Sequence, residues 1–478
     1  MLTNRTKIIA TLGPASFAPA VLRELVQAGT NVFRINFSHV DYSMLQELIQ
    51  NIRTIEAEEN KHISILGDLQ GPKIRVGVVE GEGAFLEDGA ITTVTTEPCT
   101  SNKDRIFINY EPLAREASPL EEFLIDDGKI KLQVVQRLSP TELEMKVVHG
   151  GILKSKKGVN LPNTPISLPA LTEKDRKDLD FILSNDFNWV ALSFVRSVND
   201  MLELKRIIRD RGVDIGVMAK IEKPAALKQL EAIISESDAV MVARGDLGVE
   251  MPIEELPMIQ RRIVKCCIAA AKPVVIATQM MESMTTAFLP TRAEASDVAH
   301  GVLEGADALM LSGETSVGAH PARVVDYMRK IIAQVELADS IYYKNFDIPN
   351  AELTFHSDLI CETAVKMAKK VEAKGLITMT FSGYTALRAA SYRPKTPVYC
   401  FTSNEKLLKR IPLFWGVRGF RFENMESTDA GIQLSHEILT RKGYLNAGDV
   451  VINLASMPIQ DRQRTNTLKI SQISNHDQ

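Results

Sequence analysis

Cysteine is scarce in this chain, and the charge balance lacks a basic excess. There are five cysteines in 478 residues and no CxxC pair, which argues against a disulfide framework and predicts packed thiols in a reducing compartment. Cys266 and Cys267 are adjacent in a helix-like run, so they cannot both face one metal. The formal net charge of -4 argues against general binding to nucleic acids or anionic membranes, because both need a positive surface.

Long apolar runs are also missing. No uninterrupted apolar run approaches the roughly 18 residues of a membrane span, and the N-terminal MLTNRTKIIATLGP has no apolar signal core. We therefore expect a cytoplasmic protein. Hydrophobic residues make up 45% and charged residues 24% of the chain, as in an ordinary globular protein, and the length predicts about three domains.

A short apolar run that ends in polar residues and leads into a helix-like segment recurs along the chain. Eight such runs are TKIIATLG, NVFRINFS, ISILGDL, WVALSFV, IGVMAKI, AVMVARG, PVVIATQ and ALMLSGE. Parallel strands with both faces covered by helices have this nearly continuous apolar character. The eight strand-and-helix units predict an α/β fold with a (β/α)8 TIM barrel, in which the active site lies at the C-terminal ends of the strands.

Polar residues follow every one of these runs. They include Arg34, Asn36, Ser38, His39, Asp68, Ser193, Arg196, Lys220, Glu222, Gly245, Asp246, Thr278, Gln279 and the segment from Ser312 to Thr315. A charge at one strand end is common at protein surfaces and carries little weight. Eight polar ends in succession favour a catalytic mouth at one end of the barrel.

The fifth and sixth runs carry the strongest local signal. A helix-like segment joins IGVMAKI to AVMVARG, which predicts neighbouring parallel strands. Their C-terminal ends would bring together the ammonium of Lys220 and the carboxylates of Glu222 and Asp246. This set suits a divalent cation, an oxyanion and a developing enolate. The alternative is an exposed group of mixed charges.

The connection between the third and fourth runs is too long for a simple crossover. It contains the strand-like segments ITTVTT, DRIFIN, FLIDDGKI, KLQVVQRL and ELEMKVVHGG, with Gly and Asp turns between them. We predict a small inserted β-barrel domain placed as a lid over the mouth. Basic residues in GPKIR, where it starts, and in KSKKGVNLP, where it ends, are either hinge cations that close on phosphate or solvated charges. For Lys154 and Lys156 we prefer the second interpretation.

The pattern changes after FDIPNAEL, which is typical of a connector. The strand-like runs GLITMT, PVYCFT, GVRGFRF, DVVINLA and TLKIS then alternate with helical segments and predict an open α/β sheet. The predicted domains are a first barrel part at 1–70, the lid at 71–168, the second barrel part at 169–346 and the C-terminal α/β domain at 347–478.

A series of ordered segments closely resembles the pyruvate kinase family. The segments are KIIATLGPAS, FRINFSH, GDLQGPKIR, DDGKI, KKGVNLP, LPALTEKD, MAKIE, MVARGDLGVE, ATQMMESM, PTRAEASDVA and LMLSGETSVG. They cover nearly the whole chain up to Ala333, and PTRAE together with LSGET is highly specific. The resemblance implies transfer of the phosphoryl group of phosphoenolpyruvate to ADP, which leaves an enolate that is protonated to pyruvate. The open-sheet domain matches the family's C-terminal regulatory domain.

The resemblance implies roles for the charged strand ends. Glu222 and Asp246 match the family's ligands for Mg²⁺ or Mn²⁺, and hard oxygen ligands with open positions suit both ions. The ion would bridge the enolate oxygen and the phosphoryl group. Lys220 matches a cation directed at the moving phosphoryl group, and removing such a group costs on the order of 3 kcal/mol of barrier. Arg34 matches an arginine that binds the phosphoryl group.

The resemblance also identifies residues that would contact the carboxylate and the methylene of the substrate. Ala243, Gly245 and Asp246 match the segment whose backbone amides hold the carboxylate. This is physically reasonable, because ARGD opens a helical stretch whose N–H groups attract anions. Thr278 matches a residue near the enolate methylene that helps to deliver the proton through water, since a hydroxyl alone is too weak an acid.

Other matches lie on the nucleotide side. Arg75 and Lys157 match lid residues that contact nucleotide phosphates. Asn36 and His39 belong to the same nucleotide-side loop, although for His39 a helix-capping role is the alternative. Asp127, in DDGKI, is similar to a lid carboxylate that reaches the metal of the nucleotide.

The chain departs from the family pattern at Lys73. Many members have Glu there and use potassium, which is held by groups that match Asn36, Ser38, Asp68 and the carbonyl of Leu69. A lysine ammonium has the charge of potassium and nearly its size, so Lys73 would permanently replace the ion, and we predict an enzyme that does not require potassium. An ammonium beside a bound potassium ion would be repelled by roughly 4 kcal/mol at 4 Å for an effective dielectric constant near 20.

Regulation and assembly are implied only in outline. The loop TFSGYTA, from Thr380 to Ala386, joins hydroxyls, a glycine and a helix start that fit a phosphate, while an N-cap by Ser382 fits equally well. The last loop, ASMPIQDRQRTN, lacks the family's glycines, so a phosphorylated or nucleotide effector would bind differently there or not at all. The family resemblance implies a homotetramer with Arg292 near a subunit boundary.

Two other functions remain open from the sequence. A metal-dependent lyase could stabilise a pyruvate enolate on Lys220, Glu222 and Asp246 without a nucleotide. A catalytically inactive effector-binding protein is the other alternative. The lid residues Arg75 and Lys157 argue against a lyase, which needs no nucleotide clamp. The presence of the ammonium and both carboxylates argues against an inactive protein.

Overall fold

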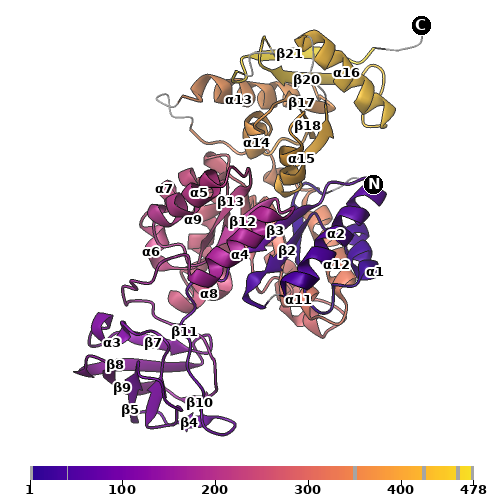
Figure 1. The fold of residues 1–478 in the computed structure, drawn as a ribbon. Coiled ribbons are helices and arrows are strands. Elements are labelled where there is room, and N and C mark those ends of the chain that lie inside the picture. Colours follow the sequence, from indigo (N-terminus) through magenta and orange to yellow (C-terminus); the bar gives the residue numbers. More distant parts are fainter. Residues whose placement is uncertain (1–3, 40, 348–352, 423–426, 459–462, 475–478) are drawn as a thin grey trace.

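The computed structural model describes residues 4–39, 41–347, 353–422, 427–458 and 463–474. A lid of strands, a barrel and a C-terminal α/β domain follow one another along the long axis of the molecule, with the barrel in the middle (Figure 1). None of the helices in this described part of the chain combines the length and apolar character that crossing a bilayer requires.

Eight parallel strands form the central barrel, which confirms the predicted fold. They are β1 (Lys7–Thr11), β2 (Val32–Asn36), β3 (Ser64–Asp68), β12 (Trp189–Leu192), β13 (Gly216–Ile221), β14 (Ala239–Ala243), β15 (Val274–Ala277) and β16 (Ala308–Leu311). Strand β1 pairs with both β2 and β16, which closes the barrel. Every residue of β13, β14, β15 and β16 is buried, as expected for strands covered on both faces.

Helices surround the barrel and alternate with its strands. The longer ones are α1 (Pro19–Ala28), α2 (Tyr42–Glu58), α4 (Glu173–Ser184), α5 (Val198–Asp210), α7 (Leu230–Glu236), α9 (Leu256–Ala269), α10 (Arg292–Glu304) and α12 (Pro321–Val335). The short helices α6 (Pro224–Leu227), α8 (Arg244–Glu250) and α11 (Gly313–Ser316) lie in the turns after β13, β14 and β16. Helices α4 and α10 begin with reciprocal capping boxes, in which Thr172 pairs with Asp175 and Thr291 with Glu294.

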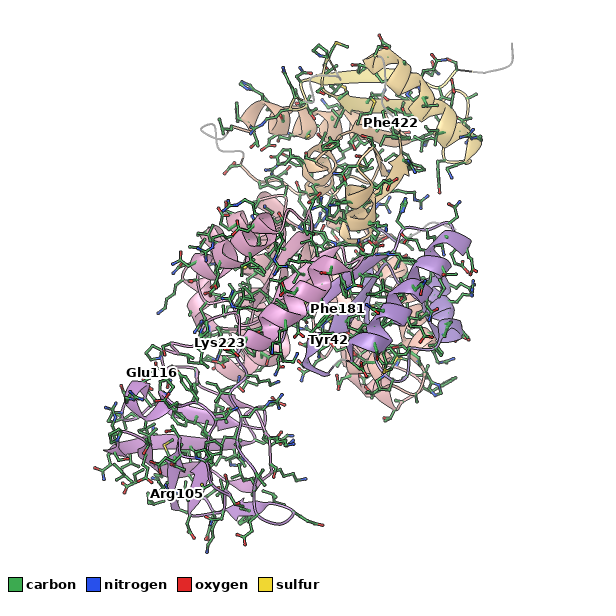
Figure 2. The ribbon with its side chains drawn as sticks, viewed as in Figure 1. Tyr42, Arg105, Glu116, Phe181, Lys223 and Phe422 are labelled. Carbon is green, nitrogen blue, oxygen red and sulfur yellow. The ribbon has the colours of Figure 1, made fainter. Side chains whose placement is uncertain are left out.

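The barrel closes across the site where the lid is inserted. Strands β3 and β12 flank the insertion in sequence, yet they pair in parallel, with Trp189 opposite Leu66. On the outside, the ring of Tyr42 from α2 stacks on Phe181 from α4 at 4.8 Å, and its hydroxyl donates to Asp178 at 2.6 Å (Figure 2). The hydrogen bonding of the barrel is therefore continuous between the two strands that flank the lid.

The lid is a mixed sheet that curls into a small barrel. Its strands are β4 (Ala84–Leu86), β5 (Ile91–Thr95), β6 (Arg105–Phe107), β7 (Glu122–Ile125), β8 (Ile130–Ser139), β9 (Glu142–His149), β10 (Gly151–Leu153) and β11 (Val159–Asn160), with one short helix, α3 (Leu113–Glu116). Six strands lie in the order β11-β7-β8-β9-β5-β6. Bridges from Arg75 to Gly158 and from Val76 to Ile108 link both edges of this sheet through one segment.

The C-terminal domain is an open, mostly parallel sheet with helices, as predicted. It contains α13 (Phe355–Lys370), β17 (Gly375–Met379), α14 (Tyr384–Ser391), β18 (Val398–Thr402), α15 (Glu405–Arg410), β19 (Val417–Arg421), α16 (Thr428–Arg441), β20 (Val450–Ala455) and β21 (Thr467–Gln472). The strand order is β19-β18-β17-β20-β21, and β21 runs antiparallel at the edge.

A buried ion pair joins this domain to the barrel. Arg393 and Asp307 approach to 2.9 Å, and their side chains are only 2% and 6% exposed. The guanidinium also donates to the carbonyl of Gly305 at 2.6 Å, and the second oxygen of Asp307 accepts from the backbone N–H of Trp415 at 3.3 Å. The pair is therefore hydrogen-bonded on both sides of the domain boundary.

We expect Arg393→Met to lower the thermal unfolding midpoint by several degrees, measured by calorimetry. The substitution leaves Asp307 buried without its partner, which costs about 3 kcal/mol or more. Lys395→Gln is the matched control, because its ion pair with Asp339 is exposed and should contribute nothing measurable. Equal midpoints for Arg393→Met and the control would show that the buried pair does not hold the domains together.

Candidate active site

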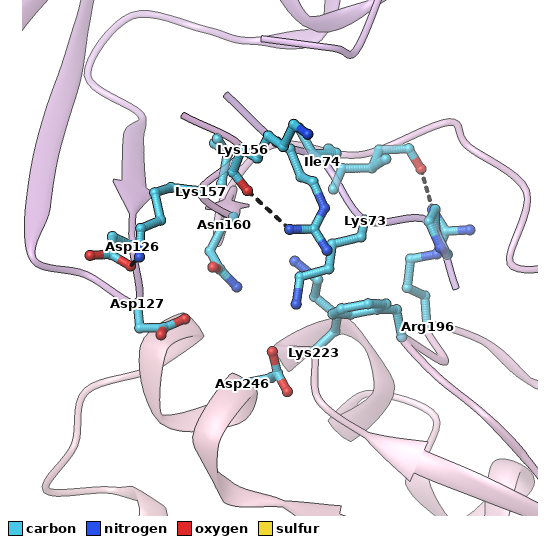
Figure 3. A pocket seen from close by; sticks show the side chains of 16 residues that line it. Lys73, Ile74, Asp126, Asp127, Lys156, Lys157, Asn160, Arg196, Lys223 and Asp246 are labelled. Carbon is cyan, nitrogen blue, oxygen red and sulfur yellow. Dashed lines mark hydrogen bonds and ion pairs between the residues drawn. The ribbon is translucent and has the colours of Figure 1, made fainter. Parts of the chain in front are cut away.

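The C-terminal ends of the barrel strands face the lid, and a cavity of about 160 Å³ lies between the two (Figure 3). Lys73, Arg75, Lys157 and Asn160 reach it from the lid side, and Lys223 and Asp246 reach it from the barrel. Most of these side chains are cationic. The cavity therefore favours an anion held between lid and barrel.

Lys220 lies at the centre of a buried polar cluster at the barrel mouth. It is 8% exposed. Its Nζ donates to the hydroxyl of Ser193 at 2.6 Å and lies 2.9 Å from Glu222 and 3.2 Å from Asp68. Burial acts to lower the pKa of Lys220, but the carboxylates of Asp68 and Glu222 outweigh it, so its pKa is raised. The ammonium is therefore held charged and fixed in direction.

Asp68 connects this ammonium to a guanidinium. Its Oδ2 accepts from Nε of Arg34 at 2.7 Å, and Nη1 of Arg34 also donates to Thr11 at 3.0 Å. Burial acts to raise the pKa of Asp68, but the charges of Lys220 and Arg34 more than compensate and lower it. One ionised carboxylate thus orients both cations, and its two oxygens are already occupied.

Glu222 and Asp246 are the two carboxylates predicted to hold a metal ion, and Oε2 of Glu222 accepts from the N–H of Phe194 at 2.7 Å. Burial raises the pKa of Glu222, and the nearby charge of Asp246 raises it further. The described residues contain no cluster of three or more metal-ligating His, Cys, Asp or Glu side chains. Two carboxylates with the remaining positions open to water and substrate suit Mg²⁺ or Mn²⁺, so the donor set fits such an ion. The positive charge of the ion would offset the repulsion between them.

Thr278 follows β15 in the left-handed backbone region, with φ 71. Its hydroxyl accepts from the N–H of Gly245 at 2.7 Å and donates to the carbonyl of Ala277 at 2.5 Å. Ala243 is the N-cap of α8, which carries Gly245 and Asp246 in its first turn. The structure therefore brings together the four residues that were predicted to contact the substrate carboxylate and methylene.

Arg244 holds this backbone in place. Its guanidinium makes two contacts of 2.7 Å with Asp297 and donates to the carbonyl of Thr278 at 2.8 Å. A bidentate pair of this kind fixes direction as well as distance. Asp297 lies on α10, so the helix that begins in PTRAE supports the backbone of Thr278 at the barrel mouth.

The predicted nucleotide residues of the lid line the same cavity. Lys157 pairs with Asp126 at 2.8 Å, and this hydrogen bond contributes most to lowering the pKa of Asp126. Arg75 donates to the backbone carbonyl of Lys156 at 3.0 Å. Asp127 also lines the cavity. Lys157 and Arg75 are thus partnered within the lid, and Figure 3 shows Lys157 beside Asp126.

Among the described residues, no hydrogen bond or ion pair joins Lys73 to the residues of the proposed potassium site. Asn36 lies opposite Asp68 in the barrel and accepts from the N–H of Ser38 at 3.1 Å. The carbonyl of Leu69 accepts from the hydroxyl of Ser193 at 2.7 Å. Lys73 is exposed and lines the lid cavity instead. The side chain of His39 lies outside the described residues.

The C-terminal loop is stabilised by its own hydroxyls. Thr380 accepts from the N–H of Gly383 at 3.1 Å, and Ser382 accepts from that of Tyr384 at 3.3 Å. The N-cap of α14 is Gly383, with φ 86, so the alternative interpretation with Ser382 as N-cap is wrong. The left-handed conformation suits glycine because it has no Cβ. Arg292 is exposed at the first position of α10.

Some contacts were not predicted from the sequence. Glu250 is fully buried as a side chain, forms an ion pair with Lys223 of the barrel and accepts from the amide of Asn160 in the lid at 2.8 Å. Asp297 was missed as the partner of Arg244. Glu250 ends α8 and Asp297 lies within α10, so neither acid stands directly at a strand end. The only available signal was that Lys223 and Arg244 directly adjoin predicted site residues.

Family models and individual relatives both match this chain to pyruvate kinases. Residues 3–325 match the family model "Pyruvate kinase, barrel domain", and residues 358–471 match "Pyruvate kinase, alpha/beta domain". The chain is 41% identical to a pyruvate kinase of Methylorubrum extorquens, with 99% of this chain and 98% of the relative covered. It is 40% identical to one of Mycobacterium tuberculosis, with 100% of each covered.

A solved structure shows the same fold. The crystal structure of a pyruvate kinase from Cryptosporidium parvum superimposes with a TM-score of 0.91 at 32% sequence identity, and 98% of this chain and 96% of the other are covered. The family models together span most of the chain and include both parts of the barrel. The chain therefore belongs to the pyruvate kinase family.

Proposed function

We propose that this protein transfers the phosphoryl group of phosphoenolpyruvate to ADP and so produces pyruvate and ATP. The observation that carries the proposal is the convergence of Lys220, Glu222 and Asp246 at the barrel mouth. One fixed ammonium lies 2.9 Å from a buried carboxylate, and a second carboxylate lies close enough to raise the pKa of the first. Such a set suits a reaction in which negative charge moves between oxygen atoms.

The charged residues have two separate roles in the proposed phosphoryl transfer: the carboxylates bind a metal ion and the cations stabilise the phosphoryl group. Glu222 and Asp246 would hold Mg²⁺ or Mn²⁺, which when bound supplies Lewis-acid neutralisation of enolate and phosphoryl oxygens. Lys220 and Arg34 stabilise the charge on the moving phosphoryl group. Their shared contact with Asp68 supports this role, because it fixes both cations before the substrate arrives and so avoids reorganisation during the reaction.

Helix α8 and Thr278 would bind the carboxylate of the substrate and position its methylene. Backbone amides at Ala243, Gly245 and Asp246 would bind the carboxylate. The hydroxyl of Thr278 would orient a water molecule that protonates the enolate methylene. Arg244, itself paired with Asp297, donates to the carbonyl of Thr278 and so restrains the backbone that carries this hydroxyl.

Nucleotide binding is assigned to the lid and the loop after β2. Arg75 and Lys157 would contact the phosphates of ADP, Asp127 would approach the metal of the nucleotide, and Asn36 and His39 would complete this side. The cationic lining of the cavity supports a nucleotide clamp, which an enolate lyase would not need. We also propose the domain limits 1–70, 71–168, 169–346 and 347–478 given above.

Assembly, regulation and location follow from the family alone. We propose a cytoplasmic homotetramer in which the exposed Arg292 lies near a subunit boundary. A phosphorylated or nucleotide effector would bind on the C-terminal domain. The loop from Thr380 to Ala386 is the proposed position, although its hydroxyls are engaged in their own turn.

We expect Lys220→Met to lower kcat by about 100-fold or more, because the fixed cation at the moving phosphoryl group is lost. The assay couples pyruvate formation to a second enzyme, and KM for phosphoenolpyruvate is measured in parallel. Arg206→Met, on the outer helix α5, is the control and should leave kcat unchanged. Turnover that persists without ADP would favour the lyase, and full activity of Lys220→Met would refute the assigned role.

We propose that Lys73 makes potassium unnecessary. Lys73 lines the same cavity as Asp246, and its ammonium would permanently supply the single positive charge that potassium supplies in other members. The rate should stay level as KCl replaces tetramethylammonium chloride at constant ionic strength. Lys73→Glu should make the rate rise with KCl, since a carboxylate there would attract a monovalent cation. A many-fold activation of the unmodified protein by potassium would show that the proposal is wrong.

We expect Mn²⁺ to bind more weakly to the free protein as the pH falls, measured by electron paramagnetic resonance. Protons compete with the metal for carboxylates, and burial raises the pKa of Glu222. Competition should therefore begin at a higher pH than for an exposed glutamate. Glu222→Gln should bind Mn²⁺ poorly at every pH. Affinity that does not change with pH would exclude Glu222 as a ligand.

A further inference from the structure

Glu250 joins the barrel to the lid through a single oxygen atom. It is the last residue of α8, and its side chain is fully buried. Its Oε1 forms an ion pair with Nζ of Lys223 and accepts from the amide of Asn160, in β11 of the lid, at 2.8 Å. Its Oε2 has no hydrogen-bond partner among the described residues. Both contacts of the carboxylate therefore depend on the position of one atom.

The ion pair connects the two segments that carry the proposed metal ligands. Lys223 directly follows Glu222, at the point where β13 has ended and α6 begins. Glu250 ends the helix that has Asp246 in its first turn. Because α8 is only 7 residues long, a restraint on its last residue also restrains its start. The Lys223–Glu250 pair thus ties one ligand segment to the other.

The barrel sheet does not set the spacing of these segments by itself. The last pairing between β13 and β14 joins Ile221 to Val242. Glu222 and Asp246 both come after this pairing in the sequence, so side-chain contacts must contribute to their separation. Two carboxylates can share one Mg²⁺ only at a narrow separation, because its bonds to oxygen are about 2.1 Å long.

Phe194 restrains the first ligand segment from another side. Its N–H donates to Oε2 of Glu222 at 2.7 Å, and its ring centroid lies 5.9 Å from Nζ of Lys223. The backbone of Phe194 has φ 55, which is uncommon for a bulky residue and persists only where surrounding contacts enforce it. Lys223 is therefore held between this ring and the carboxylate of Glu250.

Asn160 carries the contact into the nucleotide side of the lid. Strand β11 pairs antiparallel with β7, with Asn160 opposite Leu124. Strand β7 ends at the residue before Asp126, which is the partner of Lys157. A displacement of the lid that carried β11 away from the barrel would break the hydrogen bond to Glu250.

We propose that Glu250 is a positioning residue that sets the spacing of the two metal-ligand segments through Lys223 and links that spacing to the lid through Asn160. This inference rests on the proposed function, because it takes Glu222 and Asp246 as the metal ligands. Among the described residues, Lys223 and Asn160 line the cavity between lid and barrel but Glu250 does not (Figure 3). Glu250 therefore acts through its partners.

The test measures binding of Mn²⁺ to the free full-length protein by electron paramagnetic resonance. The double variant Lys223→Met/Glu250→Met keeps the net charge and leaves no buried charge unpaired. Its Kd for Mn²⁺ should rise about tenfold, as is typical when residues that orient metal ligands are replaced. Glu250→Asp keeps the charge but withdraws the carboxylate by one methylene, so its Kd should also rise. Lys223→Arg can keep the ion pair and should retain the original Kd.

The matched controls are Lys228→Met/Glu254→Met and Glu254→Asp, because both residues are exposed and adjoin the same two segments. They should leave the Kd for Mn²⁺ unchanged. An unchanged Kd in both the double variant and Glu250→Asp would overturn this inference and leave the proposed function intact. Absence of Mn²⁺ binding by the unmodified protein would overturn both.

A double-mutant cycle tests the lid contact, with KM for ADP measured at saturating Mn²⁺. Asn160→Ala should raise KM for ADP severalfold in the unmodified protein, because the lid loses its bond to the barrel. In the Lys223→Met/Glu250→Met background the same substitution should leave KM unchanged, since the carboxylate that Asn160 contacts is absent. Equal rises in both backgrounds would show that Asn160 acts without Glu250 and would overturn the link to the lid.

Discussion

A buried set of opposite charges at the barrel mouth is the interaction on which the site depends. Asp68 stands between Arg34 and Lys220, and Glu222 contacts the same ammonium. Two cations and two carboxylates balance one another there. Asp246 adds a third carboxylate, so the cluster has an excess of negative charge. A bound divalent cation would make the net charge positive. Because buried charges are costly without partners, the geometry of each member depends on the presence of the others.

The barrel makes this arrangement possible through register. Asp68 ends β3, Lys220 lies near the end of β13, and Ser193 follows β12, the strand that pairs with both. Neighbouring parallel strands end at the same height, so residues that are far apart in sequence meet at one edge. Secondary contacts then refine the site: the Arg244–Asp297 pair fixes the backbone at Thr278.

Much of the fold could be predicted because its signals are local. Each apolar run shows its own strand, and the eight together define the barrel. The mouth was predictable for the same reason, since strand ends are visible in the sequence. Contacts between distant helices were not predictable: nothing in the sequence pairs Glu250 with Asn160 or Asp297 with Arg244. The C-terminal loop also misled, because Gly383 rather than Ser382 caps α14.

The closure of the lid has a mechanical consequence. The segment that seals its two edges, at Arg75 and Val76, immediately follows the chain's exit from the barrel. The N–H of Val159, on the returning chain, donates to the carbonyl of Ile74 at 3.0 Å. The chain that enters the lid and the chain that leaves it are thus hydrogen-bonded to each other at the base of the lid. A turn of the lid relative to the barrel would therefore bend the chain on the barrel side of these pairings and leave the lid sheet intact.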